Sequence, residues 1–181
     1  MVAEGFAGRL DQLQRLWSPW RMSYIRGVGE AQGCPFCVLP ARGAEHDAET
    51  LVVHRGEAVF VILNSYPYNP GHLMVVPYRH ISALEELTEA ELFEMAALCQ
   101  RSVRALKASS GPEAFNIGLN IGSAAGAGIA DHLHQHVVPR WGGDTNFMPV
   151  IGQTRVLPEL LEETYERLAP AFATPEPSTG P

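Results

Sequence analysis

His132-Leu133-His134-Gln135-His136-Val137-Val138 sets three histidines at alternate positions within an apolar run. Successive side chains of a strand point to opposite faces of a sheet, so we expect all three imidazoles on one face. A row of imidazoles can bind a metal, hold an anion or attack an electrophile. The alternative, surface histidines paired with solvent or carboxylates, is the weaker interpretation because clustered histidines generally mark a site. The run therefore predicts a strand over 132–138 that carries a functional site.

Four segments upstream of this run have the β-branched or alternating character of strands. Turn signals at Gly56-Glu57 and Asn69-Pro70-Gly71 separate the first three of them. The four expected strands span 50–54, 58–63, 72–77 and 114–121. Together with the histidine run they predict a five-stranded antiparallel sheet.

A long helix is expected between the third and fourth strands. Thr88 and Glu91 have the spacing of a capping box, which predicts a helix from about 89 to 108. One buried stripe is predicted from apolar residues at three- and four-residue spacing: Leu92, Met95, Ala96, Cys99, Val103 and Leu106. A second helix is expected over 158–169. The fold class is therefore α+β, a five-stranded antiparallel sheet with a long crossover helix and a C-terminal helix.

The length of 181 residues is typical of one domain with a proper core. The net charge of −7 disfavours a partner that is a nucleic-acid polymer, although one locally positive pocket can still hold a phosphorylated ligand. No apolar stretch reaches transmembrane length and no signal peptide is recognisable, so we expect a cytoplasmic protein that binds no membrane. Composition predicts a flexible N-terminus over 1–13, a single folded domain over 14–169 and a disordered tail over 170–181.

The histidine run resembles the signature of the histidine triad (HIT) superfamily of nucleotidyl hydrolases and transferases. A second block resembles another conserved part of that family: Asn64-Ser65-Tyr66-Pro67-Tyr68-Asn69-Pro70-Gly71-His72-Leu73-Met74-Val75-Val76-Pro77. The resemblance spans about residues 14–160. Two further strings are most similar to actinobacterial members described as diadenosine tetraphosphate phosphorylases: Leu16-Trp17-Ser18-Pro19-Trp20-Arg21-Met22 and Arg140-Trp141-Gly142-Gly143-Asp144-Thr145-Asn146-Phe147. The resemblance implies a HIT-like fold, usually as a homodimer or higher homo-oligomer.

The resemblance also implies a role for each catalytic histidine. His134 would be the nucleophile that takes AMP from the substrate, and His136 would hydrogen-bond the phosphate or the leaving oxygen. The backbone carbonyl of His132 would orient the nucleophile. Covalent catalysis of this kind divides one hard displacement into two easier ones. By the same resemblance, Asn64 would lie near the ribose hydroxyls and Asn120 near the phosphates, with a turn or strand-end cap as the alternative for each.

Four more residues are candidates for the substrate site. His72 is a family position near the triad, and we expect it to give structural support. Gly126 and Gly128 belong to a glycine-rich loop whose backbone N–H groups can approach phosphate oxygens, although most such loops are mere turns. Arg140 can bind phosphate through both guanidinium nitrogens or pair with Asp144.

The same loop departs from the family pattern. Many hydrolases carry Gln and then Ser or Thr four and three residues before the first triad histidine, where this chain has Gly128 and Ile129. The missing amide leaves room for an acceptor other than water, such as orthophosphate.

Cys34 and Cys37 have the two-residue spacing with which both thiolates can bind one Zn²⁺. A redox pair and a reduced, empty pair are the alternatives. The resemblance to zinc-bearing relatives implies that His80 and His132 complete a closed Cys₂His₂ site, which would be structural. His46 is a competing ligand because it is nearer in sequence. No organic cofactor is expected.

The sequence thus predicts a nucleotidyltransferase that cleaves dinucleoside polyphosphates through an AMP–His134 intermediate, with orthophosphate as acceptor. It would convert diadenosine tetraphosphate into ATP and ADP. The first alternative is a hydrolase of dinucleoside polyphosphates or adenosine phosphoramidates, with water as acceptor. A non-catalytic nucleotide sensor and a simple metal-binding protein are alternatives from other classes.

Overall fold

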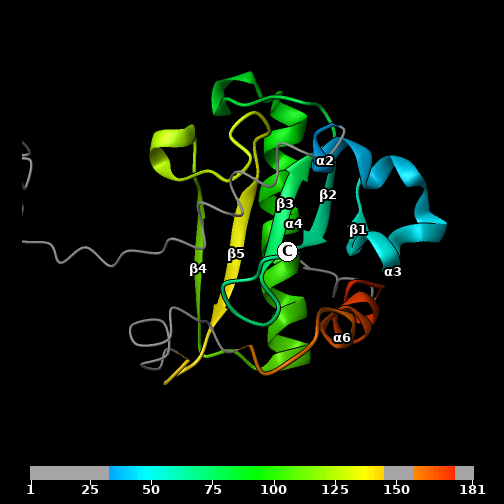
Figure 1. Ribbon diagram of the computed structural model, residues 1–181, viewed down its shortest axis with the longest axis vertical. Helices are drawn as coiled ribbons and strands as arrows, with labels where there is room; N and C mark the ends of the chain where they lie inside the picture. Colours follow the sequence, from blue (N-terminus) through cyan, green and yellow to red (C-terminus); the bar gives the residue numbers. More distant parts are fainter. Residues whose placement is uncertain (1–32, 145–156, 174–181) are drawn as a thin grey trace, which may run out of the picture.

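The computed structural model describes residues 33–144 and 157–173 of the chain. Five strands form one antiparallel sheet with the order β1-β2-β3-β5-β4 (Figure 1). The strands are β1 (Val52–Arg55), β2 (Val59–Leu63), β3 (Leu73–Pro77), β4 (Ala114–Leu119) and β5 (Gln135–Arg140). The predicted α+β fold with a five-stranded antiparallel sheet is therefore confirmed.

Two longer helices and several short ones surround this sheet. The crossover helix α4 (Glu89–Ser110) joins β3 to β4, and α6 (Leu161–Ala173) packs beside it against β1. The short elements are α2 (Pro35–Val38), η2 (Pro40–Arg42), η3 (Ala44–His46), α3 (Asp47–Thr50), η4 (Leu84–Glu86) and η5 (Ser123–Ala125). In the described part of the chain, no helix is both long and apolar enough to cross a bilayer.

Strands β2 and β3 are buried along their whole length because both faces of the sheet are covered. Leu73 and Val75 belong to the larger core cluster, which α4 and α6 complete. Met74 and Val76, which alternate with them, belong to a second cluster that includes Phe36 of α2. Each fully buried aliphatic side chain contributes about 1.5–3 kcal/mol relative to an exposed one. The sheet therefore separates a helical core on one face from a smaller layer on the other.

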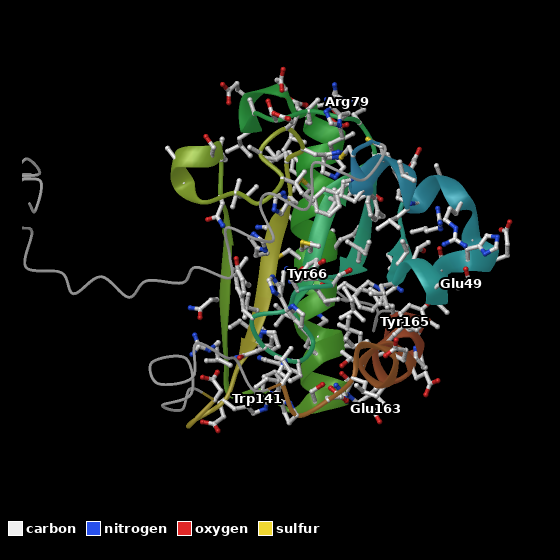
Figure 2. The ribbon with its side chains drawn as sticks, in the orientation of Figure 1. Glu49, Tyr66, Arg79, Trp141, Glu163 and Tyr165 are labelled. Atoms are coloured by element: carbon white, nitrogen blue, oxygen red, sulfur yellow. The ribbon has the colours of Figure 1, made fainter. Side chains whose placement is uncertain are left out.

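The capping box predicted at the start of α4 is confirmed. Thr88 Oγ1 accepts from the backbone N–H of Glu91, and the Glu91 carboxylate accepts from the backbone N–H of Thr88 at 2.8 Å. Arg79 donates to both carboxylate oxygens of Glu91 at 2.7 Å, at the upper end of the molecule in Figure 2. These contacts, with the Arg79 bonds the largest cause, lower the pKa of Glu91 to about 2.

The predicted buried stripe of α4 is wrong in part. Leu92 is 52% exposed and Ala96 is exposed, whereas the buried positions are Glu91, Met95, Leu98, Ser102, Ala105 and Leu106. The face is rotated because two polar residues are satisfied locally: Glu91 pairs with Arg79, and Ser102 Oγ donates to the carbonyl of Leu98 at 2.7 Å. Apolar spacing alone does not reveal polar residues that can be buried in this way.

The last helix runs farther than predicted. It spans Leu161–Ala173 rather than 158–169 and contains Pro170, so the first residues of the expected tail are helical. Phe172 is 2% exposed in the larger core cluster, and Arg101 donates to its carbonyl. Burial of Phe172 thus outweighs the backbone hydrogen bond that proline removes. The predicted flexible segment 1–13, the string 16–22, the last three residues of the string 140–147 and the tail after residue 173 lie outside the described residues.

The histidine strand begins later than predicted. β5 starts at Gln135, so the expected strand 132–138 loses its first three residues and gains Pro139 and Arg140. The ladder between β3 and β5 ends at Val75 and Gln135. Beyond it, Pro77 has no N–H to donate, and the carbonyl of Pro77 accepts from the ring of His132 instead of from a strand. Smaller differences affect β1, which starts at Val52, and β4, which ends at Leu119.

Replacing Glu91 with Gln is expected to lower the free energy of unfolding at neutral pH by about 1–2 kcal/mol, since hydrogen bonds between charged partners are lost. A carboxylate whose folded pKa is depressed stabilises the fold above its unfolded pKa of 4.5. The difference between wild type and E91Q should therefore shrink as pH falls from 4.5 toward about 2. Denaturant unfolding across this range measures it.

Glu89→Gln is the matched control, because Glu89 lies in the same helical turn and is exposed. We expect E89Q to change stability by less than about 0.5 kcal/mol. A pH-independent loss in E91Q would contradict the assignment of its stabilising effect to the ion pair.

Candidate functional site

His134 is a buried histidine held by the backbone of its own segment. Its Nδ1 lies 2.8 Å from the carbonyl oxygen of His132. A carbonyl only accepts, so Nδ1 carries the proton and Nε2 carries the lone pair. Burial lowers the pKa of His134 below the usual value for histidine, and the bond to the carbonyl opposes this effect. The ring is therefore a neutral imidazole with a defined nucleophilic nitrogen.

His136 lies next to His134 and has the opposite tautomer. The two ring centroids are 4.9 Å apart. Nδ1 of His136 lies 2.9 Å from Nε2 of His72, whose own Nδ1 faces the backbone N–H of Tyr68 at 3.1 Å. Because Nδ1 of His72 must accept, its Nε2 carries the proton and donates to His136. Nδ1 of His136 thus accepts, which leaves the proton of a neutral His136 on Nε2.

The turn between β2 and β3 builds the support for His72, which is fully buried. Asn64 Oδ1 accepts from the backbone N–H of Tyr66, and Asn64 Nδ2 lies 3.3 Å from Nδ1 of His72. The ring of Tyr68 lies 4.6 Å from that of His72. Tyr66, labelled in Figure 2, is itself 62% exposed on this turn. The turn-cap alternative for Asn64 is thus present in the structure, and the same amide supports His72.

A second cluster adjoins the triad and includes its first histidine, His132. One ligand atom from each of Cys34, Cys37, His80 and His132 lies within 4.8 Å of the others. Nδ1 of His132 is 3.3 Å from Sγ of Cys34 and 3.6 Å from Sγ of Cys37, and Nδ1 of His80 is 3.4 Å from Sγ of Cys37. A tetrahedral Zn²⁺ with about 2.3 Å to sulfur and 2.0–2.1 Å to nitrogen needs sulfur–nitrogen separations of about 3.6 Å. The four residues therefore fit a tetrahedral metal ion.

The proton positions also suit a metal. Nε2 of His132 donates to the carbonyl of Pro77 at 2.9 Å, so Nδ1 presents its lone pair to the thiols. Burial is the largest cause that raises the pKa of Cys34, which keeps this thiol neutral until a cation stabilises the thiolate. His46, the competing ligand, instead lies beside Arg42 and Glu49 at 3.4 and 3.5 Å.

A groove of about 370 Å³ adjoins His136 on the face opposite α4. It is lined by residues of β4, β5 and the turn before β3: Tyr68, Asn69, Asn116, Ile117, Gly118, Leu119, Asn120, His136, Val138 and Arg140. Arg140 lies at its far end and donates through Nε and Nη2 to Asp144 at 2.6 and 2.8 Å. Its Nη1 donates to Asn116 Oδ1 at 2.8 Å. The Asp144 pairing, left open by the sequence, is therefore formed.

The structure thus brings most of the predicted residues together in two adjoining clusters. His136 and Asn120 line the groove, and the rings of His134 and His72 both contact His136. The four candidate metal ligands form the other cluster. Gly126 ends η5 with a φ of +85°, which glycine adopts without strain, and neither it nor Gly128 lines the groove.

Sequence reasoning missed two contributors to the site. Phe36, between the two cysteines, places its ring 5.0 Å from that of His134. Asn116 lines the groove and is oriented by Arg140. Side chains alternate along β4, and Asn116 pairs with Val138, two residues after His136 on β5. Asn116 therefore lies on the same sheet face as His136, and this alternation could have predicted it.

A model of the HIT domain matches residues 45–143. The chain belongs to the HIT domain family. The AP-4-A phosphorylase of Mycobacterium tuberculosis (strain CDC 1551 / Oshkosh) is 49% identical over 174 residues, which are 92% of this chain and 88% of that protein. The asymmetrical bis(5'-nucleosyl)-tetraphosphatase of Schizosaccharomyces pombe is 30% identical over 93 residues, 51% of this chain and 50% of that protein. A Zn-bound histidine triad family protein from Mycobacterium smegmatis has a solved structure with a TM-score of 0.60 and 30% identity, covering 78% of this chain and 94% of that one.

The four-ligand cluster is expected to bind about one Zn²⁺ or Co²⁺ per chain, because its donors have tetrahedral spacing. Metal content by elemental analysis and the Co²⁺ absorption spectrum measure this. Cys34→Ser should reduce the stoichiometry sharply. Cys99→Ser, on α4 and outside the cluster, is the control that should retain the metal. Full metal content in C34S would contradict the assignment.

Proposed function

We propose that this HIT family protein is a diadenosine tetraphosphate phosphorylase, a nucleotidyltransferase that works through a covalent AMP–His134 intermediate. The observation that carries the proposal is the pair of opposite tautomers at His134 and His136. A buried neutral imidazole with its lone pair on Nε2 is a nucleophile, and the neighbouring ring presents Nε2–H as a donor. The 49% identical relative named AP-4-A phosphorylase supports this substrate and acceptor.

In the first displacement, Nε2 of His134 attacks the α-phosphorus of one adenylyl group. The P–N bond forms while the bond from that phosphorus to the bridging oxygen breaks. Nε2–H of His136 donates to this oxygen as negative charge develops on it, and ATP leaves. In the second displacement, an oxygen of orthophosphate attacks the same phosphorus, the P–N bond breaks, and ADP leaves. The lone pair returns to Nε2 of His134, so each turnover converts diadenosine tetraphosphate and orthophosphate into ATP and ADP.

His72 acts through His136. Its Nδ1 accepts from the backbone N–H of Tyr68, so its Nε2–H donates to His136 and fixes the proton of that ring on Nε2. Asn64 extends this support through the turn. His72 and Asn64 are positioning residues in this proposal.

The groove beside His136 accommodates the leaving half of the substrate. It begins at the ring that donates to the leaving oxygen, and its volume of about 370 Å³ matches a small ligand site. Asn120 lies on its wall as a proposed phosphate contact, and Arg140 holds Asn116 in place. The backbone N–H of Gly126 already donates to the carbonyl of Ser123 at 3.0 Å, so in this proposal Gly126 shapes the loop and Gly128 offers its backbone N–H to the polyphosphate.

Zinc is the proposed metal of the Cys₂His₂ cluster, and its role there is structural because four protein ligands leave no open position. A zinc-bound HIT neighbour supports this choice of metal. Thiols that bind zinc must stay reduced, which supports a cytoplasmic setting for the protein.

Product analysis tests the proposed reaction. With diadenosine tetraphosphate and orthophosphate, wild type should yield ADP and ATP, with no turnover when phosphate is left out. His134→Asn should abolish turnover, a loss of at least about 10³-fold, because the covalent path is removed. The measurement is chromatography of the nucleotides, with the adenylylated His134 trapped by acid-free quenching and detected by mass spectrometry.

His46→Asn is a suitable control, since His46 lies away from the triad with Arg42 and Glu49. If AMP and ATP form without phosphate, the protein is a hydrolase and not a phosphorylase. The relative from Schizosaccharomyces pombe is named as such a hydrolase. If the protein binds nucleotide but forms neither product nor covalent adduct, the non-catalytic nucleotide sensor is the correct interpretation.

A homodimer formed through the β4 edge is the proposed assembly. β4 ends the sheet order, has no charged residue or proline, and leaves Ile117 47% exposed. Such an edge is a template for pairing with another strand, and a two-fold axis lets two copies of β4 pair antiparallel. Phe115 and Leu119, on the same face as Ile117, are only partly buried against the larger core.

Ile117→Lys should convert the dimer to a monomer, because it puts a charge into the pairing surface. Light scattering after size exclusion measures the change. Leu160→Lys replaces another apolar residue, 66% exposed before α6, and should leave the dimer intact. A wild-type monomer at micromolar concentration would overturn the assembly.

A further inference from the structure

The nucleophile lies outside the sheet. Both ladders that hold β5 end at the same residue: β3 pairs up to Gln135 through Val75, and β4 pairs up to Gln135 through Leu119. His132 lies in a bend, and none of the residues from His132 to His134 belongs to a strand. Inter-strand hydrogen bonds, which fix the position of His136, therefore do not fix the position of His134.

Contacts from the metal-site segments hold His132 to His134 instead. The ring of His132 is shared between the thiols and the carbonyl of Pro77. The backbone N–H of Leu133 donates at 2.6 Å to the carbonyl of Ile81, the residue after the ligand His80. Each of the two residues before His134 is thus attached to a segment that carries a metal ligand.

The third contact reaches the nucleophile itself. Phe36, the residue before Cys37 in the Cys34–Cys37 turn, is 3% exposed. Its ring centroid lies 5.4 Å from that of His132 and 5.0 Å from that of His134. Fixing the two cysteines therefore fixes the aromatic wall against which the His134 imidazole rests.

We propose that the metal centre positions the nucleophile: through Phe36, His132 and the Leu133–Ile81 hydrogen bond, it replaces the missing ladder and holds His134 in line with the phosphorus. This inference rests on the proposed function, because it assumes that His134 is the nucleophile and that the four-ligand site holds zinc. It goes beyond a structural site, since the metal acts on the rate of the chemical step.

Geometry makes the chemical step sensitive to such support. A displacement of a reacting atom by about 1 Å can lower a rate on the order of 10²-fold. Without metal, the cysteine sulfurs meet the nitrogens of the two histidines at 3.3–3.6 Å with no ion to bond them together, and His80 is exposed. Without a shared ion, the segment that carries the two cysteines can move relative to the segments that carry His80 and His132.

The effect is expected to be local because the main core lies elsewhere. The larger cluster packs α4 and α6 against the opposite face of the sheet, and it contains none of the four ligands. The ladders from β1 to β4 also remain. Removal of the metal should therefore loosen His132 to His134 while the rest of the fold persists.

Amide hydrogen exchange of the full chain, loaded with zinc and after chelation, tests this directly. Chelation should speed exchange at Leu133 by at least about tenfold, with little change at Leu98 of α4 or Val61 of β2. The kcat of nucleotidyl transfer should fall about 10–100-fold, the usual effect of disturbing supporting contacts, with KM nearly unchanged. Readded zinc should restore both. Unchanged exchange at Leu133, or equal loss of protection throughout the chain, would overturn the proposal.

Phe36→Leu tests the aromatic contact while all four ligands remain. Phe60→Leu is its matched control, because Phe60 lies in the same cluster, is fully buried, and stacks on Tyr78. Both variants should melt at lower temperature and keep full zinc content. Only F36L should lower kcat, by about tenfold, with KM changed less. If kcat is equal in the two variants, Phe36 does not help to position His134.

The two levels of proposal can fail separately. A zinc-loaded wild type that makes neither ADP nor AMP from diadenosine tetraphosphate would end the proposed function. The exchange rate at Leu133 needs no substrate, so it reports on the link between the metal centre and His134 in either case.

Discussion

The hydrogen bond from Nδ1 of His134 to the carbonyl of His132 is the constraint on which the rest of the site depends. It decides which nitrogen of the buried ring carries the lone pair. A carbonyl inside a regular ladder already accepts from the neighbouring strand, so this bond is favoured where residue 132 lies outside the sheet. β5 starts at Gln135, which places residue 132 there. Leaving the sheet then creates the need for other support, which the segments bearing Cys34, Cys37 and His80 supply.

His134 and His136 show how neighbouring groups give two identical side chains different tautomers. His134 bonds a carbonyl and is left with a lone pair on Nε2, whereas His136 bonds a donor and is left with Nε2–H. No carboxylate is among the causes that shift the pKa of His134, which burial lowers. A neutral imidazole is far cheaper to bury than a carboxylate, so the proposed nucleophile needs no charged partner in the site.

Much of this arrangement could be predicted from the sequence, and the failures share a physical cause. Alternating residues and turn signals predicted all five strands, and the spacing of Thr88 and Glu91 predicted the start of α4. Burial of Glu91 and the exposure of Leu92 could not be predicted, because they depend on Arg79, a distant residue that reaches the helix terminus only after folding. The full set of candidate metal ligands was predicted only from a family resemblance, since 95 or more residues separate the cysteines from His132. Local pattern carries no information on contacts at that range.

The histidine run itself illustrates the limit most clearly. Period-two spacing predicts three equivalent imidazoles on one face, yet the structure uses them in three ways. The ring of His132 faces the thiol of Cys34, and its carbonyl accepts from His134. The ring of His134 lies against Phe36, and His136 accepts from His72. What distinguishes them is the position at which the two ladders of β5 stop, which is Gln135 on both sides. On the β3 side, Pro77 has no N–H to donate and its carbonyl bonds the ring of His132, so the contacts of this histidine are those of a loop and not of a strand.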